Sequence, residues 1–186
     1  MPPKNENSVT QPETSMQVMS TDLLQQAIDL LQLIENDQYT KISDVMPGST
    51  IGKHLRHLYD HFRLLYAKCD DIPDNWIVDY DIRARNDPSE SDRLIAIDRF
   101  KEMQSVVRKN SHVSLDTPLT LSATITAADN NKYQFSSSFG RELFYCCIHA
   151  IHHYASIKAI CVEQNISTPK EFGVAPSTLQ ELQKKN

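Results

Sequence analysis

Four stretches of the chain place apolar residues three and four positions apart, the spacing of a helix with one buried face. The first predicted helix starts near Ser20 or Thr21, and the second starts after Ser49 or Thr50 and ends at about Cys69. The third follows Pro88, and the fourth runs from about Phe139 to Glu163. The last of these is apolar on nearly all sides, so we expect it to lie inside the fold. Four helices with long crossover connections predict an all-α protein, a four-helix bundle.

A different pattern separates the third and fourth predicted helices. The segments LTLSATIT and KYQFSS alternate apolar and polar residues around the turn ADNN, which predicts a small β-hairpin before the last helix. Residues 1–19 are rich in Pro, Asn, Ser, Thr, Gln and Glu and lack any period, so they are expected to form a disordered tail. The predicted domain therefore spans residues 20–180, with a short tail over 181–186.

Composition narrows the class of protein. The chain has 186 residues, about one domain, and its 4 glycines form no phosphate-binding G-x-G-x-x-G or G-x-x-x-x-G-K-[ST] loop. A net charge of -5 argues against a nucleic-acid partner, and no apolar run approaches the ~20 residues that span a membrane. The four cysteines form no C-x-x-C motif and the start of the chain has no apolar signal core, so we expect reduced thiols and a cytoplasmic protein.

Histidines are the candidate chemistry. Six of the seven fall in two windows, on the second and fourth predicted helices: His54, His57, His61, His149, His152 and His153. Positions four apart stack on one helix face, so His149 and His153 can converge on one point, and the second-helix cluster also faces inward. Three neutral imidazoles around one divalent ion leave a coordination position open, as in a catalytic site. Spacing alone does not select which second-helix histidine takes part.

A second interpretation of the histidines stays open. A histidine on an apolar helix face is commonly a hydrogen-bonded core residue, so the chain could be an interaction module whose imidazoles only fill space. His54 and His152 are expected to lie outside any ligand set, and His112 is expected in a loop.

The segments HLRHLYDHF and IHAIHHYASI together resemble the DinB-like superfamily, which includes bacillithiol-dependent transferases and the mycothiol-dependent maleylpyruvate isomerase. Over about residues 20–178, the resemblance implies a four-helix bundle with a divalent metal on three histidines, one in H-L-x-D and two in H-x-x-x-H. In this chain His57 begins the first motif, and His149 and His153 form the second. The resemblance thus selects His57, His149 and His153 as ligands of zinc, nickel or iron.

The expected function follows from this resemblance. We expect a metal-dependent transferase or hydrolase acting on a small-molecule substrate, with a thiol as co-substrate, although no catalytic residue can be named. The alternatives are a non-enzymatic metal-binding or stress-associated bundle that forms a homodimer or binds another protein, and the interaction module above. The sequence leaves open whether the protein is an enzyme.

Several residues near the proposed ligands have two interpretations each. Cys146 lies three positions before the H-x-x-x-H pair and is either a fourth ligand favouring zinc or a small buried residue. Glu142 either orients an imidazole or interacts favourably with the start of the helix. Arg83 and Arg85 either clamp an anionic substrate or lie in a solvated loop. Asp60 is expected to support the bundle or the site.

Overall fold

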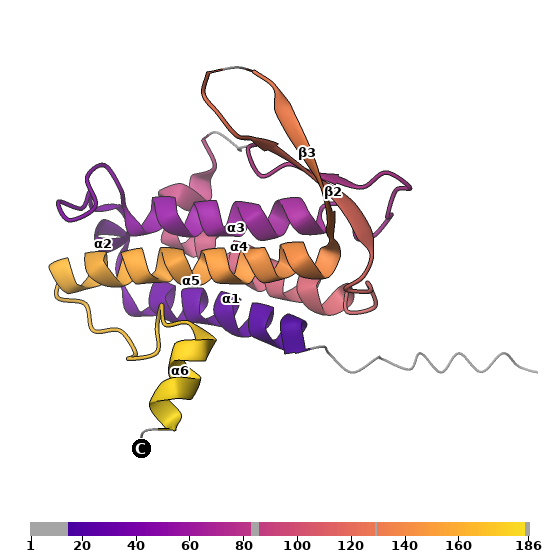
Figure 1. Ribbon diagram of the computed structural model, residues 1–186. Coiled ribbons are helices and arrows are strands. Elements are labelled where there is room, and N and C mark those ends of the chain that lie inside the picture. Colours follow the sequence, from indigo (N-terminus) through magenta and orange to yellow (C-terminus); the bar gives the residue numbers. More distant parts are fainter. Residues whose placement is uncertain (1–14, 83–85, 129, 185–186) are drawn as a thin grey trace, which may run out of the picture.

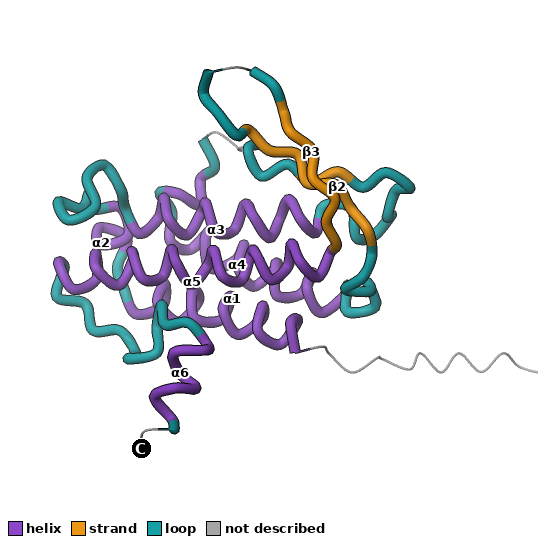
Figure 2. The backbone as a smooth tube through the Cα atoms, in the orientation of Figure 1, coloured by secondary structure: helices purple, strands orange, loops and turns teal. Residues whose placement is uncertain are grey.

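The computed structural model describes residues 15–82, 86–128 and 130–184. In chain order, the described elements are α1 (Ser15–Leu33), α2 (Asn36–Thr40), α3 (Ile51–Tyr66), β1 (Ile77–Val78), a 3-10 helix (Pro88–Glu90), α4 (Arg93–Lys109), β2 (Pro118–Thr124), β3 (Lys132–Ser138), α5 (Phe139–Glu163) and α6 (Pro176–Gln183). The described chain is mostly helical, with a small sheet beside the helices (Figures 1 and 2).

The four long helices lie side by side around one apolar core (Figure 1). Helix α1 packs against α4 and α5, and α3 packs against the same two helices. Tyr154 of α5 is fully buried, and its hydroxyl donates a hydrogen bond to the carbonyl oxygen of Leu23 on α1. None of the described helices is long and apolar enough to cross a membrane.

The sequence predicted the later helices best. Helix α5 begins and ends at the predicted residues, and α3 begins after Thr50, whose hydroxyl accepts a hydrogen bond from the Lys53 N–H. Helix α4 begins at Arg93 because the Asp92 carboxylate caps two N–H groups, while Pro88–Glu90 forms a separate 3-10 turn.

The predicted start of the first helix near residue 20 is wrong. Helix α1 begins at Ser15, and its added first turns bury Gln17 and pack Met16 and Met19 against the core. Residues 15–19 of the predicted tail are therefore helical, while residues 1–14 lie outside the described residues. At the other end, α6 crosses the predicted domain boundary at residue 180.

The mostly helical prediction is confirmed in outline, but the small β-hairpin that it included is part of a three-stranded sheet. The predicted hairpin is confirmed: β2 and β3 pair antiparallel from Pro118↔Ser138 to Thr124↔Lys132. A third strand, β1, adds to β2 in parallel, giving the order β1-β2-β3. Because β1 has two residues, it is too short to show any alternation in the sequence.

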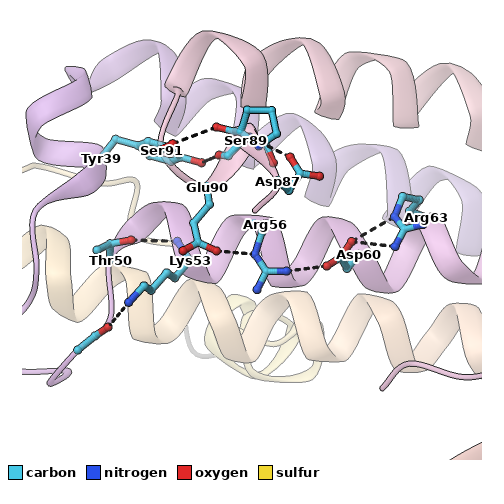
Figure 3. Close-up of polar contacts among 12 residues, drawn as sticks. Tyr39, Thr50, Lys53, Arg56, Asp60, Arg63, Asp87, Ser89, Glu90 and Ser91 are labelled. Atoms are coloured by element: carbon cyan, nitrogen blue, oxygen red, sulfur yellow. Dashed lines mark hydrogen bonds and ion pairs between the residues drawn. The ribbon is translucent and has the colours of Figure 1, made fainter. Parts of the chain in front are cut away.

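Close contact between α3 and the 3-10 turn depends on Gly52. A Cβ atom there would collide with the carbonyl oxygen of Glu90 and lie 3.0 Å from the ring of Tyr39. The Tyr39 hydroxyl in turn donates a hydrogen bond to the Ser89 carbonyl oxygen, which ties the turn to α2. The absence of a side chain at Gly52 therefore lets residues 88–90 lie directly on α3 (Figure 3).

We expect Gly52→Ala to lower the free energy of unfolding by about 1–3 kcal/mol, because the added methyl group meets backbone atoms that must shift. Helix propensity alone predicts the opposite sign, a gain of about 1 kcal/mol. Urea unfolding measures the difference, with Lys53→Ala at the next, exposed position expected to change stability by no more than about 0.5 kcal/mol. A stabilised Gly52→Ala variant would contradict the close packing.

Candidate functional site

Five histidines from two neighbouring helices gather between α3 and α5. We call them the histidine cluster: His54, His57, His61, His149 and His153. Centroids of neighbouring rings lie 4.2 to 5.1 Å apart. The helical repeat of three and four residues puts each helix's members on one face, and packing of α3 against α5 brings the two faces together.

Three members direct ring nitrogens to one region. The Nε2 atoms of His57 and His149 are 3.1 Å apart, and candidate ligand atoms of His57, His61 and His149 all lie within 4.8 Å of one another. His61 Nδ1 lies 3.0 Å from the carbonyl oxygen of His57, so Nδ1 carries the proton and Nε2 keeps its lone pair. Two of the predicted ligands therefore converge with His61, which the resemblance had not selected.

His153, the remaining predicted ligand, lies beside this group. Its ring centroid is 4.9 Å from that of His57 and 4.6 Å from that of His149. Its Nδ1 lies 2.7 Å from Nδ1 of His54, so one of these two nitrogens donates a proton to the other. If His153 donates, its Nε2 lone pair is available to an ion, and the hydrogen bond to His54 fixes the orientation of the His153 ring.

The structure separates the two histidines that were expected to lie outside the ligand set. His152 is exposed, on the solvent side of α5. His54 is buried next to His153, and its Nε2 has no hydrogen-bond partner among the described residues. His54 therefore belongs to the cluster, while the exposed His112 lies in a turn as expected.

Burial makes the clustered imidazoles poor bases. Desolvation, followed by the neighbouring imidazoles, lowers the pKa of His149 and of His153 from 6.5 to about 3. Burial also lowers the pKa of His54. At neutral pH these rings are therefore uncharged, and a neutral imidazole is the form that binds a metal ion.

An open pocket of about 380 Å³ leads to the cluster. Its walls are formed by three clustered histidines and four polar residues, namely His54, His57, His153, Ser49, Lys53, Arg56 and Glu90. Arg56 is held on both sides, with Nη1 2.8 Å from Asp60 Oδ2 and Nε 2.7 Å from Glu90 Oε2 (Figure 3). Asp60 also pairs with Arg63 at 3.1 Å. The expected supporting role of Asp60 thus takes the form of an ion-pair chain along α3.

Aromatic rings close the opposite side of the cluster. Tyr80, from the segment after β1, stacks on His61 at 4.8 Å, and Tyr145 stacks on His149 at 5.4 Å. Sequence reasoning missed Tyr80, because no periodic pattern relates a loop residue to the helix face that it covers. The aromatic side explains part of the desolvation of His149.

The other residues singled out from the sequence lie apart from the converging nitrogens. Cys146 Sγ is 3.7 Å from the Tyr80 hydroxyl, and burial raises the pKa of this thiol, so it stays protonated. Glu142 is buried at the base of the hairpin, where it accepts hydrogen bonds from Ser137 at 2.6 Å and Arg141 at 3.0 Å. Arg83 and Arg85 lie outside the described residues.

We expect the metal-free protein to lose stability as the pH falls from about 6.5 towards 3. In this window the unfolded chain binds protons at His149 and His153 while the folded chain does not, so the free energy of unfolding rises with pH. The slope is at most about 1.4 kcal/mol per pH unit for each ring, and less where water screens it. Urea unfolding in the presence of EDTA, repeated over this pH range, measures the slope.

His149→Gln should flatten this dependence, and His112→Gln, a change at an exposed turn, should not. An unchanged slope in His149→Gln would show that the cluster is already protonated or open to water.

Comparison with known proteins gave one informative relative. No family model matches the chain, and no solved structure matches it. FK506-binding protein 5 of Rhizopus delemar is 50% identical to this chain over 164 residues, or 87% of the chain. The chain spans only 37% of that relative's length.

This relative overturns the family expected from the short histidine motifs. It bears the name of an FK506-binding protein, so the resemblance to the DinB-like superfamily is wrong. The expected metal-dependent transferase or hydrolase, with its thiol co-substrate, is wrong with it, since that activity rested on the same resemblance. The histidine cluster itself is a feature of the structure and does not depend on the family.

Proposed function

We propose that the four long helices form a four-helix bundle whose histidine cluster holds one divalent cation, with His57 and His149 as two of its ligands. The observation that supports this most directly is the 3.1 Å between their Nε2 atoms. Nitrogens bound to one zinc ion at about 2.0–2.1 Å would span this distance at an angle of about 100°. No reaction is assigned to the site.

Two residues compete for the third position. His153 completes the set predicted from the sequence, and its Nε2 can bind the ion when its Nδ1 donates to His54. His61 has its Nδ1 on the carbonyl oxygen of His57, which leaves the lone pair on Nε2, and its ligand atom lies within 4.8 Å of those of His57 and His149. Either set consists of three imidazoles, ligands that suit zinc, nickel and iron alike.

Burial of the thiols favours a reducing, cytoplasmic location as part of this proposal. All four cysteines are free and buried. Desolvation raises the pKa of Cys147 and Cys161 to about 11, so these thiols are protonated and unreactive at neutral pH. Four protected thiols fit a protein that does not use disulfides for stability.

We expect purified protein to bind one equivalent of Zn²⁺ or Ni²⁺ and to be stabilised by it. A ligand of the folded state alone raises the free energy of unfolding by about 2.7 kcal/mol at a hundredfold excess over its Kd. His57→Ala and His149→Ala should each abolish the shift, since each removes a shared ligand. Calorimetric titration and thermal unfolding measure both effects.

The matched control is His152→Ala, an exposed histidine of the same helix, which should leave binding unchanged. Comparing His153→Ala with His61→Ala identifies the third ligand, because substitution of the true ligand should weaken the affinity for the metal ion at least tenfold. A protein with no bound metal and no thermal shift on addition of either ion would contradict the proposal.

A second candidate function comes from the relative's name together with a pocket. An apolar pocket of about 330 Å³ lies between α1 and the segment after α5, lined in part by Leu30, Leu33, Pro169 and Phe172. The relative's name refers to the binding of FK506, and small-molecule pockets are mostly apolar and start at about 300 Å³. We propose as the alternative that this pocket binds part of FK506.

For this candidate, Leu33→Arg should weaken FK506 binding about tenfold or more, because it places a charge at the apolar rim. Leu94→Arg, an equally exposed leucine on α4, is the control. His149→Ala should have no effect, which separates this function from cation binding. If titration calorimetry detects no binding of FK506 to the wild-type chain, the candidate is wrong.

A further inference from the structure

Strand β3 is the outer strand of the sheet and contacts α5 only near its own C-terminal end, where it runs into that helix. The hairpin of β2 and β3 projects beyond the helical body (Figures 1 and 2). Every residue of β3 is exposed or half-exposed, and among the described residues β2 is its only neighbour in the sheet. One long edge of β3 therefore faces solvent.

The backbone groups on that edge can be assigned from the register. Residues of an antiparallel strand point their N–H and C=O groups alternately to either side. The Phe139 N–H donates to the Thr117 carbonyl oxygen at 2.9 Å, and this pair continues the register of β2 with β3. Counting back by twos, Phe135 bonds towards β2, so Gln134 and Ser136 direct their N–H and C=O groups outward.

This edge lacks the features that normally prevent strand pairing. Its seven pairs with β2 run without a bulge, and β3 contains no proline. Its one charged residue, Lys132, lies at the far end and is bound by Asp79 at 3.1 Å and Asp81 at 2.7 Å. The central part of the edge is therefore uncharged and regular.

Two aromatic side chains accompany the open edge. Tyr133 and Phe135 are two positions apart, so they lie on the same face of the sheet, and they are 44% and 46% exposed. Aromatic pairs across neighbouring strands are among the more stabilising contacts in sheets. A partner strand at this edge would cover both rings.

We propose that β3 pairs antiparallel with β3 of a second copy of this chain, about a two-fold axis at Phe135. In this register, Gln134 of each copy exchanges hydrogen bonds with Ser136 of the other. The two Phe135 rings then occupy the pair without hydrogen bonds, where side chains approach most closely. Lys132 lies opposite Ser138, so no like charges meet.

Self-pairing is favoured over a different partner because the strand complements itself. A two-fold interface requires a surface that is complementary to its own copy. When the β3 edge is rotated by half a turn about Phe135, its outward donors face the acceptors of the other copy and the two Phe135 rings meet. The result is one continuous sheet of six strands, three from each copy.

Analytical ultracentrifugation tests the proposal on the full chain. The wild type should shift with concentration from the 21.2 kDa monomer to twice that mass. Phe135→Lys places two ammonium groups together on the axis and should raise the dimer Kd at least tenfold. Phe144→Lys, at an aromatic residue 52% exposed on α5, is the matched control and should dimerise as the wild type does.

A cross-link tests the register. Phe135→Cys should form an intermolecular disulfide under mild oxidation, because residues on the axis face each other, whereas Phe144→Cys should not. The four native cysteines are buried and should not interfere. A wild type that stays monomeric at all concentrations, or a dimer that Phe135→Lys leaves intact, would overturn the proposal. EDTA should have no effect, so failure here is distinct from failure of cation binding.

Discussion

The five imidazoles packed between α3 and α5, two of them buried and three half-buried, are the constraint on which this structure depends. Polar rings in such a place are costly unless their nitrogens find partners, and here several nitrogens find them in one another and in a helix carbonyl group. Burial in the same interface lowers the pKa of His54, His149 and His153, so the chemistry of the site and the packing of the two helices have one physical cause.

The sequence predicted the parts of the fold that depend on local pattern. The bounds of α5 followed from its apolar period, and the hairpin followed from alternation around a polar turn. The start of α1 could not be predicted, because its first turns bury Gln17 and Ser20, which look like surface residues in a sequence. Strand β1 depends on pairing with a strand more than forty positions later, which no local window contains.

Prediction of the candidate site was limited in the same way. Helical spacing placed His54, His57 and His61 on one face of α3. Which histidine of α5 each of them contacts depends on how the two helices pack, and helical spacing does not contain that information. Selecting His57 required a family motif, and the family proved wrong while His57 itself lies at the centre of the cluster. Histidines three or four positions apart are expected wherever imidazoles pack between two helices. Such short motifs therefore indicate the local geometry more reliably than they indicate the protein family.

The paired histidines also have a consequence for how the chain folds. His57 and His149 are 92 positions apart, and His54 and His153 are 99 apart. Closing such long loops costs more chain entropy than closing short ones, so we expect these contacts to form late in folding. Interactions that are absent from the folding transition state act on the rate of unfolding. We therefore expect the histidine cluster to slow the unfolding of the native state and to leave the rate of folding almost unchanged.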